Sequence, residues 1–334
     1  MNRELPADLD NCIPKFDLAK PIATRAASGA TLQLLAKAVP QLVGGSADLA
    51  GSNNTMLKDY ASVGPGSYSG RNFHFGIREH AMGAVLSGLS LHGGWIVYGG
   101  TFMTFTDYFK PSIRLAAIME VPAIYVLTHD SIFLGEDGPT HQAIEHLAAL
   151  RSIPNVKVIR PADATETGVA WITALRRTKG PTALVLTRQA LPVIDRTKYA
   201  PAGLLNQGAY VLWQSGIGQP DLILIATGSE VSLALEGAIA LAKDNVNVRV
   251  VSMPSWDIFE KQPASIRNEV LPPSCTRRLA IEAGSSFGWE KYVGPKGRTL
   301  CIDHFGSSAP AKVLAQKFGF TADNVVRVSR EMLG

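Results

Sequence analysis

The segment from His129 to Gln142, HDSIFLGEDGPTHQ, holds two histidines, two aspartates and a glutamate within fourteen positions. It follows an apolar run, from Val121 to Thr128, whose β-branched residues are typical of a strand buried on both faces. Parallel α/β sheets bind ligands in the loops that follow the carboxyl ends of their strands. The spacing therefore predicts a ligand-binding turn after this strand, and the alternative is a polar surface loop.

Glu79, in FHFGIREHAMG, is expected at the junction of a strand and a helix. If the apolar residues of that helix bury the carboxylate, its pKa rises and it can share or donate a proton near neutral pH. The alternative is a first-turn glutamate that interacts favourably with the helix dipole. The local sequence does not choose between these two interpretations.

Three aromatic residues, Phe102, Phe105 and Tyr108, follow one another at steps of three, and we expect them on one face of a starting helix. Such a face can wall a pocket for a planar heteroaromatic ring, although an aromatic stripe is more often part of a core. Pro111 indicates that this helix starts late or bends.

Further candidates lie in a polar loop and at two single arginines. The segment GGSADLAGSNNT, residues 44–55, is expected to be a loop after a helix, with Asp48 and Ser52 as its functional residues. Arg25 and Arg188 stand beside the ends of predicted elements. Each guanidinium could make a two-pronged contact with a phosphate, or alternatively a surface ion pair.

The composition indicates a globular protein, since 46% of its 334 residues are hydrophobic and the net charge is +4. Lysine and arginine are dispersed, which argues against nucleic acid as a partner, whereas the small positive excess would suit an anion such as a sugar phosphate. The cysteines, Cys12, Cys275 and Cys301, lack disulfide or zinc spacing, so we assign no metal ligand and expect a cytoplasmic location. We expect neither a signal peptide nor a membrane span.

Strand-like runs alternate with helical patterns along the chain, which is typical of an α/β protein with a parallel sheet. We expect an extended arm at residues 1–16, a first domain at 17–190, a linker at 191–206 and a second α/β domain at 207–334. Strands of the first domain are expected at 73–77, 95–99, 123–128, 156–161 and 182–188. The turn ATGSE at 226–230 lacks the glycine spacing of a nucleotide-binding loop.

Five motifs taken together resemble the second half of transketolase. GGSADLAGSNNT, FHFGIREHAMG, TFMTFTDYF, HDSIFLGEDGPTHQ and LTRQ occur in that family's order and approximate spacing, and the similarity extends from about Pro14 to Gly334. The resemblance implies a doubly wound pyrimidine-binding domain with a mostly parallel sheet, followed by a smaller mixed-sheet α/β domain. It also implies an enzyme that uses thiamine diphosphate to move a two-carbon ketol unit from a ketose phosphate to an aldose phosphate.

The resemblance also implies roles for the residues that match the motifs. For the aminopyrimidine ring it implies a hydrogen-bonding glutamate and an aromatic pocket, formed by Glu79, Phe102, Phe105 and Tyr108. For the thiazolium side it implies Asp48 and Leu49. Sugar hydroxyls and protons would be handled by His129, Asp137 and His141, and the phosphate by Arg25, Ser52 and Arg188. Of these residues, Glu79, His129 and His141 would be catalytic.

The sequence departs from the family pattern in two ways. Gly51, Phe133 and Ala143 stand where bacterial relatives commonly have Pro, Gly and Pro, and Phe133 bears on the width of the substrate channel. The G-D-G motif of the family's diphosphate-binding domain, which holds a divalent metal, does not occur in this sequence. The resemblance therefore implies a subunit of a split transketolase, or a fragment, whose partner holds Mg²⁺ or Ca²⁺ and the diphosphate. Family sites lie between two chains, so we expect an assembly of two plus two chains.

Two other classes of function remain as alternatives, another enzyme of the thiamine superfamily and a protein without activity. The chain could be half of a split deoxyxylulose-phosphate synthase, or the beta-type subunit of a 2-oxoacid dehydrogenase, since these relatives share the carboxylate and the domain order. It could also be a dimerising assembly module without turnover. The HDS start of the His129 segment, the REHAMG context of Glu79 and the two arginines favour transketolase.

Overall fold

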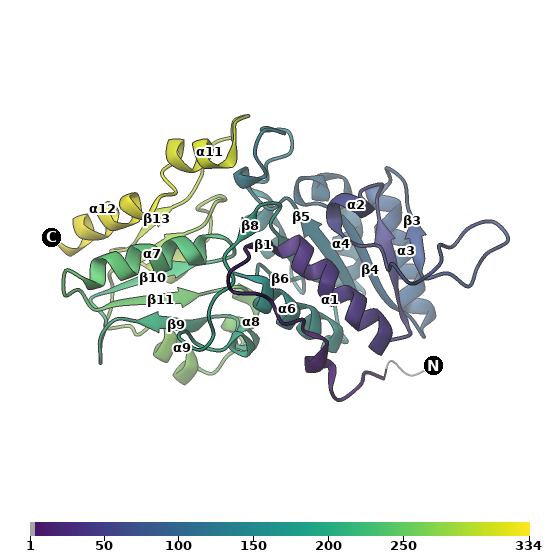
Figure 1. Ribbon diagram of the computed structural model, residues 1–334, viewed down its shortest axis with the longest axis horizontal. Coiled ribbons are helices and arrows are strands. Elements are labelled where there is room, and N and C mark those ends of the chain that lie inside the picture. The colour runs from purple at the N-terminus through teal and green to yellow at the C-terminus, as the bar shows by residue number, and fades with distance from the viewer. Residues whose placement is uncertain (1–3) are drawn as a thin grey trace.

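The computed structural model describes residues 4–334, which form two α/β domains that lie side by side (Figure 1). The first domain is built on a six-stranded sheet in the order β3-β2-β4-β5-β7-β6, and all of its neighbouring strands are parallel. The strands are β2 Leu42–Ser46, β3 Asn72–His74, β4 Ile96–Phe102, β5 Ala123–Thr128, β6 Lys157–Ile159 and β7 Thr182–Leu186. The carboxyl ends of these strands meet at one edge of the sheet.

Helices cover both faces of this sheet. Helices α1 (Thr24–Ala38) and α6 (Ala164–Arg176) pack together on one face, where Ile124 and Val126 of β5 join their core. Helices α3 (Glu79–His92), α4 (Thr106–Ile118) and α5 (His146–Arg151) cover the other face, against Tyr125 and Leu127. Alternate residues of β5 thus enter opposite cores, as the period of a strand dictates.

The second domain has a five-stranded mixed sheet in the order β13-β12-β10-β11-β9, in which only β9 runs antiparallel to its neighbour among the described strands. The strands are β9 Tyr210–Gln214, β10 Leu222–Ala226, β11 Val248–Ser252, β12 Arg278–Ile281 and β13 Arg298–Leu300. One face packs on α7 (Glu230–Ala242) and α12 (Ala322–Leu333). The other face is covered by α8 (Trp256–Glu260), α9 (Ala264–Val270) and α10 (Glu290–Val293).

Short elements complete the chain and connect the domains. Strand β1 (Ile22–Ala23) pairs antiparallel with β8 (Ala190–Leu191), and helix α11 (Ala311–Lys317) of the second domain packs on the 3-10 helix η3 (Ile132–Leu134) of the first. The other short helices are η1 Leu9–Cys12, α2 Ala50–Asn53, η2 Met103–Phe105 and η4 Ala202–Gln207. None of the helices among residues 4–334 has the length and apolar character that crossing a bilayer requires.

The expected fold class, a doubly wound parallel sheet followed by a mixed-sheet α/β domain, is confirmed. Two local expectations are wrong. Residues 1–3 of the expected arm lie outside the described residues, and residues 4–16 are not simply extended, because η1 forms and Leu9 is buried in the core beneath α1 and α6. The segment that starts at Gly44 is not wholly a loop, because Gly44 and Gly45 belong to β2.

The two glycines of β2 explain why the sequence concealed this strand. A Cβ atom on Gly44 would overlap the carbonyl oxygen of Tyr98 in β4, and one on Gly45 would overlap that of Phe73 in β3. Glycine is depleted in strands in general, so a Gly-Gly pair predicts a turn. Here the close approach of the neighbouring strands requires it.

Candidate functional site

The candidate residues collect at the carboxyl edge of the first sheet. His129 directly follows β5, Phe102 ends β4, and Asp48 lies on the turn after β2. Both His129 and Asp48 have a φ of 60°, a left-handed conformation that non-glycine residues seldom adopt. Such conformations cluster at ligand-binding sites because the surrounding structure must stabilise them.

The aromatic residues form a continuous wall rather than one helix face. Phe102 lies in β4, Phe105 ends η2 and Tyr108 lies in the first turn of α4, so the expectation of a shared helix face is wrong. The ring of Phe102 stacks on His129 at 3.7 Å between centroids and on Phe105 at 5.5 Å. Phe105 lies 6.0 Å from Tyr108 and meets His141 edge-on at 5.5 Å. The strand-to-helix turn therefore places both histidines of the His129 segment against this wall.

Glu79 begins α3 at the edge of this wall. Its side chain is largely buried, with the residue 7% exposed, and its Oε1 accepts a hydrogen bond of 3.2 Å from Thr101 Oγ1. An open cavity of about 590 Å³ lies between Ile77–Ala81 and the rings of Phe105 and Tyr108. Glu79 is thus a buried carboxylate that faces a cavity, and it also lies in the first turn of a helix, where the helix dipole favours a negative charge.

His129 is held as a neutral imidazole in one orientation. Burial, together with the positive charges of Arg25 and Arg188, lowers the pKa of His129 to about 3. Its Nδ1 lies 2.8 Å from Thr128 Oγ1, and that hydroxyl donates its own proton to Asn53 Oδ1 at 2.6 Å. Nδ1 of His129 must therefore donate to the hydroxyl oxygen, which leaves the lone pair of Nε2 free to accept a proton.

The two arginines meet beside His129. Strand pairing of Ala23 with Ala190 brings the start of α1 next to the end of β7, so that Arg25 lies near Arg188. Burial and the charge of Arg188 lower the pKa of Arg25. Arg25 Nη1 donates a hydrogen bond of 2.7 Å to the backbone oxygen of Ser52 in α2. Two guanidinium groups of like charge at one place form a ready site for an anion.

The remaining candidates border the site without close side-chain contacts to it. Asp48 is exposed beside the N-terminus of α2, and Leu49 is the residue that precedes this helix. Asp137 is exposed in the loop between Gly135 and Gly138, both of which have positive φ. Their side chains are thus free to contact a ligand or another chain.

Several residues that support the site were missed by the sequence analysis. Thr101, Thr128 and Asn53 hold Glu79 and His129 through the hydrogen bonds described above, and nothing in the sequence marks them. Asp130, which directly follows His129, accepts from the guanidinium of Arg160 at 2.8 and 2.9 Å, and both residues are fully buried. Its position directly after His129 was the one feature of the sequence that could have identified Asp130 as a residue that supports the site.

Arg160 also joins the two domains. It follows β6 in the first domain, and its Nη1 donates to the backbone and side-chain oxygens of Thr227, both at 2.9 Å, and to Glu230. Thr227 and Glu230 lie at the carboxyl end of β10 and the start of α7 in the second domain. Nearby, Arg151 makes a two-pronged contact with Glu282, with both hydrogen bonds at 2.7 Å. Buried charges therefore connect the second domain to the turn that carries His129.

The departure at Phe133 also concerns the contact between domains. Its ring meets Phe320 of the second domain edge-on, at 5.7 Å between centroids. Phe133 thus contributes to the packing of the two domains.

Comparisons with known proteins agree on one family. Residues 20–193 match the family described as transketolase, pyrimidine binding domain, and residues 208–321 match the transketolase-like TK C-terminal domain. The chain is 55% identical over 331 residues to a transketolase of Geobacillus stearothermophilus and 54% identical over 323 residues to one of Bacillus subtilis. These matches include 99% and 97% of the chain, but only 50% and 48% of the two relatives.

Solved structures give the same result. A transketolase from Leishmania mexicana is 44% identical, with a TM-score of 0.93, and the match covers 99% of this chain and 48% of that one. A structure described as a split gene transketolase, inactive beta4 tetramer, is 26% identical, with a TM-score of 0.73. That match covers 94% of this chain and 99% of the other. The chain thus spans about half the length of the curated relatives and nearly the whole of the split-gene protein.

Proposed function

Because the chain belongs to the transketolase family, we propose that it supplies the pyrimidine-binding half of a thiamine diphosphate site and transfers ketol units together with a partner chain. The observation that carries this proposal is the wall of Phe102, Phe105, His129 and His141 beside the buried Glu79. When bound, the cofactor would supply a carbon centre that takes up and releases the two-carbon unit. Cytoplasmic location remains an expectation.

The residues at this wall fit an aminopyrimidine ring. Phe105 presents an aromatic surface at the mouth of the cavity, and Tyr108 beside it is 66% exposed, so both rings can contact a planar ligand. Glu79 opens onto the same cavity and would hydrogen-bond a ring nitrogen. Asp48 and Leu49 would lie against the thiazolium side of the cofactor. These contacts would orient the cofactor and hold a proton at the carboxyl oxygen of Glu79.

The two histidines would handle the substrate. Because His129 is neutral, its Nε2 can accept a hydrogen bond from a sugar hydroxyl without a competing positive charge. His141 lies against the ring of Phe105 and is nearer to the cofactor in this arrangement. Asp137 would accept hydrogen bonds from hydroxyl groups farther along the sugar. At the far end, Arg25, Ser52 and Arg188 would bind the phosphate, which their positive charge favours.

A partner chain would supply the diphosphate contacts and a divalent metal, Mg²⁺ or Ca²⁺. The coverage of half of each curated relative supports this division, as does the match to almost all of a protein described as a split-gene transketolase. We propose an active assembly of two plus two chains. That split-gene relative is described as an inactive beta4 tetramer, so we expect the isolated chain to lack turnover.

The direct test is reconstitution. The purified chain would be mixed with a candidate partner that carries the diphosphate-binding domain, thiamine diphosphate and Mg²⁺, with xylulose 5-phosphate as donor and ribose 5-phosphate as acceptor. We expect a seven-carbon ketose phosphate from the mixture and none from either chain alone. Analytical ultracentrifugation of the mixture should show four chains. A verified, cofactor-loaded complex without ketol transfer would refute the proposal.

A pair of matched variants tests the role of the buried carboxylate. Glu79→Gln should lower kcat of the complex by about a hundredfold to ten-thousandfold, the usual effect of a lost acid-base group. Glu269→Gln changes an exposed glutamate of α9 in the second domain and should leave kcat unchanged. An unchanged rate for Glu79→Gln would contradict the mechanism.

The same assay separates the alternatives. Turnover with pyruvate in place of the ketose phosphate would indicate a split deoxyxylulose-phosphate synthase or a 2-oxoacid dehydrogenase subunit. Stable assembly without turnover on any of these donors would indicate a non-catalytic module.

A further inference from the structure

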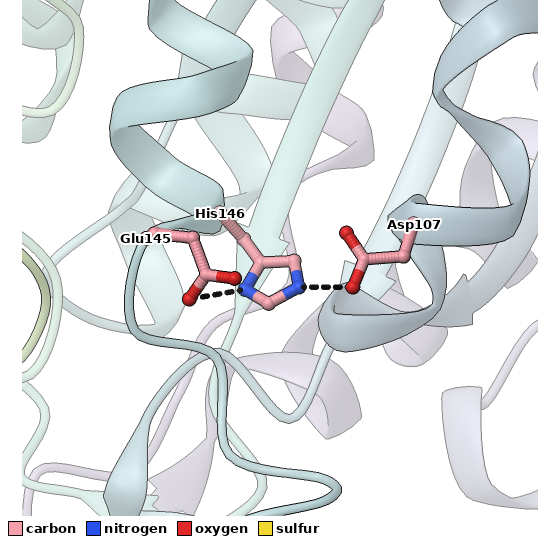
Figure 2. Close-up of side chains that lie close together, drawn as sticks. All are labelled: Asp107, Glu145 and His146. Carbon is pink, nitrogen blue, oxygen red and sulfur yellow. Dashed lines mark ion pairs between the residues drawn. The ribbon is translucent and has the colours of Figure 1, made fainter. Parts of the chain in front are cut away.

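A cluster of three ionisable residues lies outside the contacts assigned above. Asp107 lies in the first turn of α4, Glu145 precedes α5 and His146 is the first residue of α5 (Figure 2). His146 is only 4% exposed, so its polar imidazole ring is buried. Neither nitrogen makes a hydrogen bond within the described chain. A buried polar group without a hydrogen bond lowers the stability of the fold, so the burial of His146 at this place points to a ligand.

The carboxylates lie on either side of the imidazole ring (Figure 2). Nε2 of His146 is 3.3 Å from Asp107 Oδ2, and Nδ1 is 3.6 Å from Glu145 Oε2. Charge-assisted hydrogen bonds are shorter, about 2.7–2.9 Å. Bonds of about 2.0–2.1 Å to one tetrahedral metal place two ligand atoms about 3.3 Å apart. The separation of His146 Nε2 from Asp107 Oδ2 is therefore that of two ligands of one ion.

We propose that Asp107, Glu145 and His146 bind a divalent transition-metal cation of the Zn²⁺ type. One oxygen or nitrogen atom from each residue lies within 4.8 Å of the others. Because Glu145 faces Nδ1, its exposed side chain would turn around the edge of the ring toward the Nε2 side to complete a three-ligand set. An imidazole with two carboxylates suits Zn²⁺, whereas Mg²⁺ and Ca²⁺ prefer oxygen ligands alone. We assigned no metal ligand from the sequence, so this proposal goes beyond that assignment.

The surroundings of the cluster leave room for such an ion. The side chains of Asp107 and Glu145 are 54% and 57% exposed, so a metal would reach them from solvent and keep a water as its fourth ligand. Lys110 lies 3.8 Å from Oδ1 of Asp107, the oxygen that does not face His146. The two carboxylates therefore give the site a net negative charge that Lys110 only partly offsets.

A metal here would connect two parts of the first domain. Asp107 belongs to α4, which carries Tyr108, and Glu145 follows His141 by four residues. A shared ion would hold α4 against the start of α5 and limit their relative motion. Binding requires neither thiamine diphosphate nor a partner chain, so the inference is independent of the proposed function.

The test is calorimetric titration of the chelator-treated full chain with ZnCl₂ and, separately, MgCl₂. We expect one Zn²⁺ per chain with a Kd of about 1 µM or tighter, and at least about a hundredfold weaker binding of Mg²⁺. The chain loaded with Co²⁺ should show the intense visible absorption of tetrahedral coordination without the charge-transfer bands of a thiolate ligand. That spectrum separates this site from binding at the three cysteines.

Variants locate the ion. Asp107→Asn should weaken Zn²⁺ binding at least about tenfold, and His146→Gln should weaken it further. Asp59→Asn removes a similarly exposed carboxylate, which pairs with a surface lysine, Lys37, at 3.3 Å, and this variant should bind Zn²⁺ as the unmodified chain does. Asp107→Asn changes a surface residue and should keep the fold. No stoichiometric Zn²⁺ binding, or equal binding by Asp107→Asn, would overturn the proposal.

Discussion

Replacement of Arg160 by methionine should remove a large part of the stability of this chain. Arg160 is fully buried and contacts two carboxylates, those of Asp130 and Glu230. Methionine can fill much of the space but cannot compensate either charge. Loss of one partner of a buried ion pair costs about 3–5 kcal/mol of the free energy of unfolding.

Protonation sets a limit to the part of this cost that comes from Glu230. Desolvation already raises the pKa of Glu230 in the unmodified protein, and loss of Arg160 would raise it further. Without the arginine, Glu230 would take up a proton on folding. At about pH 7.5, neutralising a glutamate with an unfolded pKa near 4.3 costs about 4 kcal/mol, and at about pH 5.5 it costs about 1.6 kcal/mol. The variant should therefore lose about 4 kcal/mol at the higher pH and about half of that or less at the lower pH.

Urea denaturation followed by tryptophan fluorescence and far-ultraviolet circular dichroism measures this loss. Arg160→Met/Glu230→Gln should recover part of it, because one of the two buried charges that lacked a partner is gone, while Asp130 remains without its arginine. Arg176→Met provides a matched control, since Arg176 pairs with Asp10 at the surface and such pairs contribute less than about 1 kcal/mol. A loss below about 1 kcal/mol for Arg160→Met, or an equal loss at both pH values, would refute the reasoning.

Three further predictions concern the substrate edge of the sheet. The imidazole of His129 should stay neutral down to about pH 4, because its pKa is about 3, and an NMR titration with a midpoint near 6.5 would contradict this. As its folded pKa lies below the unfolded value, His129 should lower the stability of the chain as the pH falls from about 6.5 toward 3. Arg188→Met should raise the pKa of His129, because one of the two nearby positive charges is lost. In the active complex it should also raise KM for sugar phosphates about tenfold or more, with a smaller change in kcat. A KM equal to that of the unmodified complex would exclude a phosphate contact. Phe105→Ala should weaken binding of thiamine diphosphate to the complex by about tenfold. Phe105→Leu keeps the apolar area but not the stacking and should weaken binding less. If a fluorescence titration gave both variants the affinity of the unmodified complex, a stacked ring would be refuted.

Much of the fold could be predicted because its signals are local. The apolar run before His129 was long and β-branched enough to predict β5, and the alternation of strands and helices predicted the parallel sheet. Strand β2 was missed because Gly44 and Gly45 are dictated by neighbouring strands, which the sequence does not display. Leu9 was missed for a similar reason, since a single apolar residue in a polar segment gives no periodic signal.

In the candidate site, too, local signals could be predicted from the sequence and contacts between distant segments could not. The types and spacing of residues in the His129 segment and at Glu79 indicated that they are functional candidates. The family motifs strengthened that interpretation. No local pattern could show that Arg25 and Arg188 meet, because the pairing of β1 with β8 joins positions more than 160 residues apart. The aromatic spacing was read with the wrong geometry, since Phe102 ends a strand and the three rings meet only after the chain turns through η2.

By itself, the sequence determined which side chains are present at each strand end, since hydrophobic periodicity and motif spacing are properties of short segments. Only the tertiary structure decided how those side chains behave. Burial beside two arginines makes His129 a neutral base, Thr128 selects its proton-bearing nitrogen, and Arg160 connects its turn to the second domain. Charge, desolvation and hydrogen bonding depend on distances through space, and the packing of distant segments sets those distances.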